Sequence, residues 1–366
     1  MSSPGSYDDT GVRCTMLRGG TSRGLFFEAD DLPADGAERN DLLLRLMGSP
    51  DPRQIDGLGG STSLTSKVAV VSRSQHPDAD VDYLFLQLGV DAPTVSDQQN
   101  CGNILAGVGP FAVERGLVPA LDGETSVRIR MVNSGSIAIA SFPTPGGRVE
   151  YRGNVQIAGV PGTAAPVVLA FTDTEGSATG SLLPTGHVRD TIEGVEATCV
   201  DNGMPVVVAM AQSFGLSGYE THGELAADAA LLERIDAFRR KAGQLMGLGD
   251  VSAASVPKTA LLAPARDGGQ VCTRSFIPVQ PHTSIGVLAA VSVATGMLVP
   301  GAVGHELTAD WPAGRSQVDV EHPTGHLLVD VVVDTGATPP RAVRSGVVRT
   351  ARKLFDGTAF PQGVQR

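Results

Sequence analysis

The feature that most constrains the fold of this chain is an internal repeat, in which four short elements occur twice in the same order. Each copy reads as a strand–glycine turn–strand, a lysine opening an apolar strand, a polar entrance to an apolar helix, and a glycine before an alternating strand. The first copies begin at Cys14, Ser66, Asn100 and Val132, and the second at Thr198, Pro257, His282 and Glu321. Such a repeat predicts two similar lobes, because each copy builds one structural unit.

The composition fits this prediction. The 366 residues are 42% hydrophobic and 18% charged, with 45 Gly and 24 Pro, which favours tight turns and short strands. We expect an α+β fold with two pseudo-symmetric lobes, each a strand-rich sheet around one apolar helix. The N-termini of both helices would face an interlobe cleft, an arrangement suited to a polycarboxylate. The expected boundaries are 1–190 and 191–345, with 346–366 as a candidate completion of the first lobe.

Several functional classes are disfavoured. The net charge of −11 and the lack of a Lys/Arg run argue against nucleic acid as a partner. No P-loop pattern occurs, and the seven His form no HxxxH or HxH pair, so we expect no metal. The segment Ile285–Val303 is apolar, but its Gly, Pro and hydroxyl residues favour a helix buried inside the protein over a membrane span. Four scattered cysteines without a signal-peptide pattern predict reduced thiols in the cytoplasm.

The entrance to the first apolar helix carries the first candidate for chemistry. Asn100, Cys101, Gly102 and Asn103 directly precede the apolar run 104–115. A thiol at a helix N-terminus experiences unpaired N–H groups and the positive end of the helix dipole, which favour thiolate and bind anions. The alternative is a buried structural cysteine, which is how we interpret Cys14, Cys199 and Cys272.

Lys67 is the second candidate. It follows a hydroxyl-rich approach that ends in Ser66, and it heads a strand of Val and Ala. Burial of an amine favours its neutral form, which can accept a proton. A solvated strand-end lysine, or a lysine that serves only as a fixed cation, is the alternative.

Anion-binding candidates occur in both halves. The turn Gly20-Thr21-Ser22-Arg23 offers donors that a carboxylate accepts, although it could be a merely structural hairpin. Arg274 and His282 precede the second apolar helix, and Arg274 could equally form a surface ion pair. The position of Cys101 corresponds to Thr283 or Ser284 in the second half, so the sequence does not support a two-thiol racemase.

A set of segments spread over nearly the whole chain resembles the methylaconitate isomerase (PrpF) family. The segments are Leu17-Arg18-Gly19-Gly20-Thr21-Ser22, Gln54-Ile55-Asp56-Gly57, Thr65-Ser66-Lys67-Val68-Ala69, Asn100-Cys101-Gly102-Asn103, Gly159-Val160-Pro161-Gly162, Leu183-Pro184-Thr185-Gly186 and Arg349-Thr350-Ala351-Arg352. Further segments, among them Asp201-Asn202-Gly203-Met204-Pro205, are similar to family members of gallate breakdown. Two departures are Arg23, where relatives often have lysine, and Pro281-His282-Thr283 before Ser284.

The resemblance implies a diaminopimelate epimerase-like fold, in which each lobe is a β-barrel around a central helix. It implies cofactor-independent keto–enol tautomerisation of an unsaturated tricarboxylic acid such as 4-oxalomesaconate, with Lys67 as acid/base and Cys101 across the substrate. By the same resemblance, the substrate-binding set is Gly20, Thr21, Ser22, Arg23, Ser66, Asn100, Gly102, Asn103, Met204, Arg274, His282, Thr283 and Ser284. A 1,3-allylic Δ-isomerase of oxalomesaconate or 2-methylaconitate, and a non-catalytic carboxylate-binding protein, remain alternatives. A homodimer is a further expectation.

Overall fold

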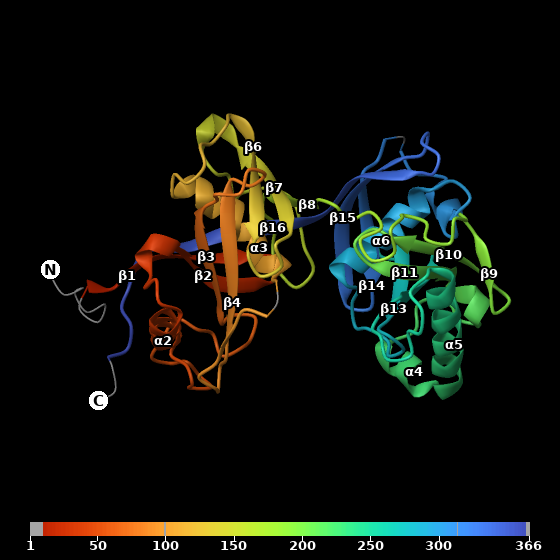
Figure 1. The fold of residues 1–366 in the computed structure, drawn as a ribbon, viewed down its shortest axis with the longest axis horizontal. Helices are drawn as coiled ribbons and strands as arrows, with labels where there is room; N and C mark the ends of the chain where they lie inside the picture. Colours follow the sequence, from red (N-terminus) through yellow and green to blue (C-terminus); the bar gives the residue numbers. More distant parts are fainter. Residues whose placement is uncertain (1–9, 99, 313, 364–366) are drawn as a thin grey trace. The chain divides into compact units, whose positions relative to one another are not determined.

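The computed structural model describes residues 10–98, 100–312 and 314–363, and these fold into two units (Figure 1). The first unit consists of residues up to Leu169 together with those from Arg349 onward, and the second consists of Ala170–Val348. The first unit therefore ends earlier than residue 190, because the chain passes into the second unit near the end of its eighth strand. The C-terminal segment belongs to the first unit.

The first unit is a closed barrel. Its strands are β1 (Val12–Gly19), β2 (Ser22–Glu28), β3 (Lys67–Arg73), β4 (Val81–Leu88), β6 (Gly123–Met131), β7 (Ile137–Thr144), β8 (Pro166–Phe171) and the second part of β16 (Arg341–Ala359). They pair in that order, and β16 also pairs with β1, which closes the sheet. A short strand, β5 (Val95–Ser96), pairs with β4.

Helix α3 (Gly102–Glu114) runs through this barrel and packs against six of its strands. Every residue from Ile104 to Ala112 is buried. Two glycines let the helix approach the wall, because a Cβ at Gly107 would collide with Phe26 and one at Gly109 with Phe142. Helix α2 (Gly36–Met47) covers the opposite face of β2 and β3 and forms a separate apolar cluster that includes Leu25 and Val68.

The second unit repeats this plan. Its strands are β9 (Asp190–Ile192), β10 (Val195–Asp201), β11 (Pro205–Met210), β12 (Lys258–Ala263), β13 (Val271–Phe276), β14 (Gln317–His322), β15 (Gly325–Asp334) and the first part of β16. Helix α6 (Val287–Leu298) packs against β10, β11, β14 and β15. Two further helices, α4 (His222–Ala227) and α5 (Ala229–Leu245), lie next to each other in sequence, and α5 joins an apolar cluster with strands β10 to β13.

The predicted repeat has a structural counterpart. The order β1-β2-β3-β4-β6-β7 in the first unit matches β10-β11-β12-β13-β14-β15 in the second, with α3 and α6 at the same point in the chain order. In both units the second and third strands are parallel, and so are the fourth and fifth. The expected α+β fold, with a strand-rich unit around each apolar helix, is confirmed.

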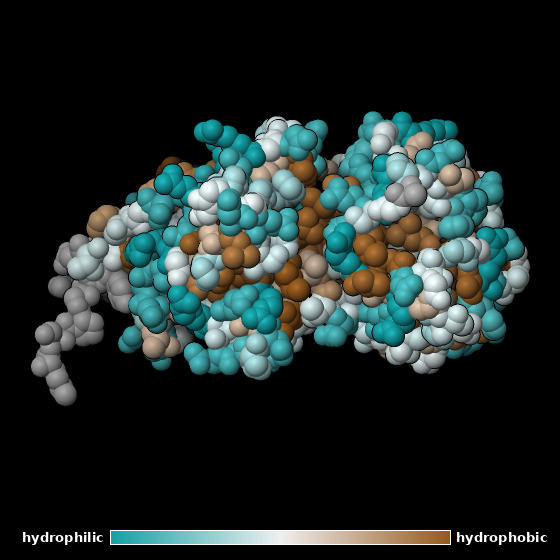
Figure 2. Space-filling view, turned by 90° about the horizontal axis from the view of Figure 1, so that it is seen from above, coloured by the Kyte–Doolittle hydropathy of each residue, from teal (hydrophilic) through white to brown (hydrophobic). Residues whose placement is uncertain are grey.

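The apolar segment Ile285–Val303 forms α6 and the turn after it, and its helical part is largely buried. None of the described helices is long and apolar enough to cross a membrane. The face of the molecule seen in Figure 2 is mostly polar, with apolar residues showing between the polar ones.

Candidate active site

Lys67 lies at the first position of β3 and is 7% exposed. Its Nζ donates to Oε1 of Gln87 at 2.6 Å and lies 5.1 Å from the centre of the Phe85 ring. Among the described residues no carboxylate pairs with this amine. A neutral amide and an aromatic face hold it instead, which leaves its lone pair or its proton available for transfer.

Gln87 has its own orientation fixed by three backbone carbonyls. Its Nε2 donates to the carbonyl oxygens of Ser66, Ser63 and Leu88 at 3.0, 3.2 and 3.2 Å. The Oε1 atom is therefore turned toward Lys67. Sequence reasoning missed Gln87. The pattern of β4 could have indicated it, because Tyr83, Phe85 and Gln87 occupy every second position and therefore share one face of that strand.

Three glycines bring the turn after β1 and the start of β3 onto the first turn of α3. A Cβ at Gly19 or Gly20 would collide with Asn103, and one at Gly24 would collide with the backbone of Lys67 and approach Ile104. Gly24 is also the register partner of Lys67 across β2 and β3. Lys67 and the start of α3 consequently lie at the same end of the first barrel.

Cys101 is the N-cap residue of α3, with φ −128° and ψ 99°, and its thiol makes no capping hydrogen bond. Its carbonyl accepts from Leu105 N at 2.9 Å and from the Tyr83 hydroxyl at 3.4 Å. Burial, and after it the nearby Cys101, raises the pKa of Tyr83 well above its ordinary value. The phenol therefore stays protonated and remains a donor to the Cys101 carbonyl.

The residues flanking Cys101 fit an anion pocket. Asn103 donates from Nδ2 to Thr21 Oγ1 at 3.0 Å, which joins the glycine turn to the helix, and Asn100 donates to Ser134 Oγ at 2.8 Å. A Cβ added at Gly102 would meet no atom within 4 Å. Open space thus lies beside the N-terminal N–H groups of α3, where a carboxylate is favoured.

Two residues of the predicted substrate-binding set do not face the start of α3. Ser66 is fully buried and donates to Gln54 Oε1 at 2.9 Å. Arg23 lies on β2 next to Gly24, which faces α3. Because side chains alternate along a strand, the Arg23 side chain points away from α3, on the same face as Leu25. It lines a cavity whose lining includes Ser22 but neither Lys67 nor Cys101.

Three of the five predicted residues of the second unit, His282, Thr283 and Ser284, lie directly before α6. Ser284 donates its N–H to His282 Nδ1 at 2.9 Å, and its Oγ lies 3.2 Å from His322 Nε2. The Thr283 carbonyl accepts from Thr324 Oγ1 at 2.9 Å. Sequence reasoning missed His322. Burial is the main cause that lowers the pKa of His322 to about 4, so its ring is neutral at pH 7.

Met204 and Arg274 are both tied into the second unit. The Met204 carbonyl accepts from Ser292 Oγ of α6 at 2.7 Å. Arg274 is 7% exposed and donates to the carbonyls of Glu220 and Thr273 at 2.6 and 2.9 Å. Neither a surface ion pair nor a free guanidinium describes Arg274, which instead joins β13 to the loop before α4.

The N-cap of α6 is Gly286, two and three residues beyond Ser284 and Thr283. The helix start that corresponds to Cys101 is therefore Gly286 rather than Thr283 or Ser284, because α6 begins later in its apolar run. This position has no side chain, so the asymmetry between the units is greater than the sequence suggested. The other cysteines, Cys14, Cys199 and Cys272, are buried free thiols, as predicted.

Comparison with known proteins identifies the family of this chain. The sequence pattern of the PrpF protein family matches residues 10–361. The chain is 54% identical to (4E)-oxalomesaconate Delta-isomerase of Novosphingobium sp., over 95% of this chain and 96% of the relative. It is also 54% identical to 4-oxalomesaconate tautomerase of Pseudomonas putida, over 95% of each. The crystal structure of a methylitaconate-delta-isomerase superposes with a TM-score of 0.84 at 32% identity, covering 97% of this chain and 96% of that one. The chain therefore belongs to the PrpF family.

Proposed function

We propose that this protein is an isomerase that moves a proton within an unsaturated tricarboxylate, with 4-oxalomesaconate as the substrate. The observation that carries the proposal is the buried Lys67 amine, held by a neutral amide at 2.6 Å, at the barrel end where α3 begins with Cys101. The names of the two relatives at 54% identity support the substrate.

In the proposed mechanism, the N–H groups at the start of α3 and the Thr21 turn bind substrate carboxylates. Neutral Lys67 removes a proton from the carbon next to the substrate carbonyl, and an enolate forms. The N–H donors at the helix start stabilise the negative charge on its oxygen. Lys67 returns to its neutral form when the proton is delivered back to the substrate. Arg23 has no step in this scheme, since its side chain faces away from α3.

The site of proton return decides the product. Delivery to the enolate oxygen gives the enol, which is keto–enol tautomerisation, and delivery to the γ-carbon shifts the double bond, which is allylic isomerisation. Lys67 can return the proton itself, or the Cys101 thiol can deliver its own proton. In the second case a thiolate and a protonated Lys67 remain, and proton exchange with solvent restores both groups. Each outcome matches the name of one relative, and the two relatives are equally similar to this chain, at 54% identity. We favour tautomerisation, in a cytoplasmic step of gallate breakdown.

Proton exchange in heavy water, followed by NMR, tests the proposal. Candidate acids are 4-oxalomesaconate, 2-methylaconitate and aconitate. Exchange only at the carbon next to the carbonyl supports the tautomerase, and deuterium at the γ-carbon with a shifted double bond supports the allylic isomerase. Binding of a tricarboxylate without exchange at any carbon would instead indicate a non-catalytic carboxylate-binding protein.

Two variants separate the roles of the candidate residues. Lys67→Met should remove exchange while the protein still folds, and near-normal activity in this variant would refute the lysine-base mechanism. Cys101→Ser asks a different question. If most activity is kept, Cys101 only positions the substrate and Lys67 serves as the single base.

A further inference from the structure

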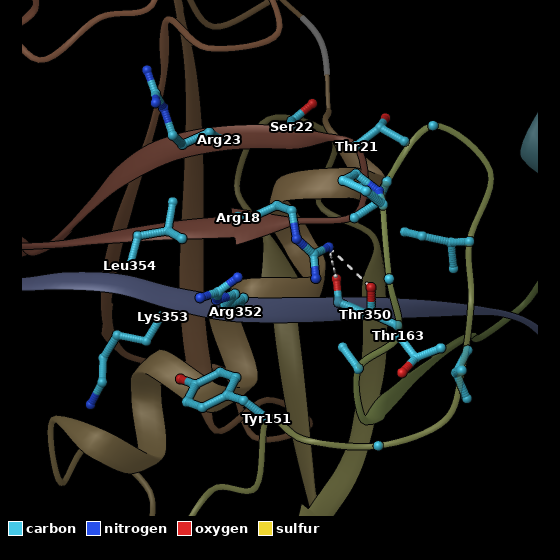
Figure 3. A pocket seen from close by; sticks show the side chains of 18 of the residues that line it. Arg18, Thr21, Ser22, Arg23, Tyr151, Thr163, Thr350, Arg352, Lys353 and Leu354 are labelled. Carbon is cyan, nitrogen blue, oxygen red and sulfur yellow. Dashed lines mark hydrogen bonds between the residues drawn. The ribbon is translucent and has the colours of Figure 1, made fainter.

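A cavity of about 720 Å³ lies in the first unit, between strands β16, β1 and β2 and the segment 151–164 (Figure 3). Its volume falls in the range of about 300–1,000 Å³ that is typical of ligand sites. Its lining includes neither Lys67 nor Cys101. Thr21, which the mechanism proposed above uses, lies at one edge of this cavity, but that mechanism gives the arginines of the lining no role.

Three arginines stand on neighbouring strands of the cavity wall and are called the arginine row. Arg352 on β16 is the register partner of Arg18 on β1, and Arg18 is the partner of Arg23 on β2. Register partners in antiparallel strands share a face with their Cβ atoms about 5 Å apart, where like charges destabilise the sheet. Figure 3 shows the three residues on neighbouring strands, with the Arg23 side chain extending away from Arg18 and Arg352. Burial, and after it the charge of Arg352, lowers the pKa of Arg18.

None of the described acidic residues neutralises this row. Among the described residues, no carboxylate forms an ion pair with Arg18, Arg23 or Arg352, although the chain as a whole carries a net charge of −11. Arg18 uses Nη1 for the carbonyls of Gly20 and Thr350 and for the Thr350 hydroxyl, at 2.8, 3.1 and 3.0 Å. The buried Arg23 Nε has no hydrogen-bond partner. These are the features of a binding site for a negatively charged ligand.

The remaining lining defines the chemistry of that ligand. Thr350 lines the cavity and its hydroxyl accepts from Arg18 Nη1 at 3.0 Å, so the site also offers a neutral hydroxyl group beside the arginines. The segment that faces the row contributes Val155, Ile157 and Val160 to the lining. The two neighbouring guanidinium groups of Arg18 and Arg352 match an anion with several oxygens better than a single carboxylate.

We propose that the arginine row of this cavity binds a small multivalent oxyanion, a polycarboxylate or a phosphate compound, on the opposite face of β2 from Lys67. The cavity shares the Thr21 turn with the proton-transfer site, but the alternation of β2 separates the arginines from it. Gly24, the register partner of Lys67, faces α3, whereas Arg23 faces the other side of the strand. The bound anion offsets the repulsion within the arginine row. The proposal stands whether or not the protein is an isomerase.

Isothermal titration calorimetry on the full chain tests this, with citrate, pyrophosphate and acetate as probes. We expect citrate or pyrophosphate to bind at the arginine row and acetate not to bind, and the probe that binds identifies the polycarboxylate or the phosphate class. Arg352 is exposed, so Arg352→Gln should fold normally. This variant should weaken binding by about tenfold or more, the usual effect of losing one charge-assisted hydrogen bond. Proton exchange by the variant should match that of wild type.

Arg148→Gln is the matched control, since Arg148 is exposed in the same unit and lies outside the cavity. It should bind the probes as wild type does, and Lys67→Met should too. Binding that survives Arg352→Gln unchanged would overturn the proposal. Equal losses of binding in Arg352→Gln and Arg148→Gln would also overturn it, because they would indicate non-specific attraction. A loss of binding in Lys67→Met alone would overturn it as well, because the anion would then bind at the proton-transfer site.

Discussion

The contact between Lys67 and Gln87 makes the sharpest prediction, through the single change Gln87→Glu. Lys67 Nζ lies 2.6 Å from Gln87 Oε1, and the Gln87 side chain is held by three backbone carbonyls. Glutamate has nearly the same shape, but it places a negative charge beside the amine and loses the Nε2 donor. A carboxylate stabilises the ammonium form. A base must be neutral to accept a proton, so the variant should be a weaker catalyst near pH 7.

The size of the effect follows from the difference between a neutral and a charged hydrogen bond. A neutral hydrogen bond contributes about 1 kcal/mol, and one to a charged group about 1.5–3 kcal/mol. The gain of about 0.5–2 kcal/mol for the ammonium form corresponds to about one pH unit, since one unit equals about 1.36 kcal/mol. Because Lys67 is only 7% exposed, solvent screens this interaction little. On the acid side of the pH profile, kcat/KM should therefore be about tenfold lower than in wild type.

The measurement is the pH dependence of kcat/KM for proton exchange, which reports the ionisation of the free enzyme. In Gln87→Glu the acid limb should move to higher pH by about one unit, and activity should recover at the alkaline end. Gln317→Glu is the matched control, because Gln317 is exposed on β14 of the other unit. Gln87→Met removes the acceptor without adding charge and should not move the limb upward. An unchanged profile in Gln87→Glu would refute Lys67 as the base.

Three other changes test separate parts of the structure. Gly102→Ala should fold as stably as wild type, because its methyl group would meet no atom within 4 Å. If a substrate carboxylate binds at the start of α3, kcat/KM should nevertheless fall in this variant. Unchanged kinetics would exclude that carboxylate site. The pKa of His322 is lowered to about 4 in the folded protein. As pH falls below about 6.5, the unfolded chain takes up a proton on this histidine before the folded protein does. The free energy of unfolding therefore decreases between about pH 6.5 and about pH 4. Urea unfolding at pH 7 and pH 4.5 should show that His322→Asn loses about 2 kcal/mol less over this range than wild type. Arg239 is fully buried and donates to the carbonyls of Val251, Ala254 and Val256, so Arg239→Met should lower the free energy of unfolding by about 3 kcal/mol.

The sequence predicts what depends on local pattern. The repeat and the two apolar helix runs predict two α+β units, since each repeated element carries its own glycine turn and apolar period. Cys101 was placed at a helix entrance for the same reason, because Gly102 and the apolar run after it mark where α3 begins. Both features appear in the structure.

What the sequence did not reveal depends on strand register. The face occupied by Arg23 follows from which residue of β2 lies opposite Lys67, and that pairing joins segments about forty residues apart. Gln87 reaches Lys67 only through the register of β3 and β4. His322 meets Ser284 across the second unit in the same way. The arginine row is the extreme case, since Arg352 and Arg18 come from opposite ends of the chain.

The two units share a backbone plan but differ in the side chains that chemistry requires. Lys258 opens β12 as Lys67 opens β3, and burial lowers its pKa. The strand beside it ends at Phe276, however, and the next residue is Ile277, so the position opposite Lys258 on that strand carries no side-chain amide, whereas Gln87 lies opposite Lys67. The helix start offers Gly286 instead of Cys101. A lysine alone can hold an anion, whereas the proposed proton transfer needs an oriented amine and a second proton-carrying group. Under the proposed function, this asymmetry therefore favours the first unit for proton transfer.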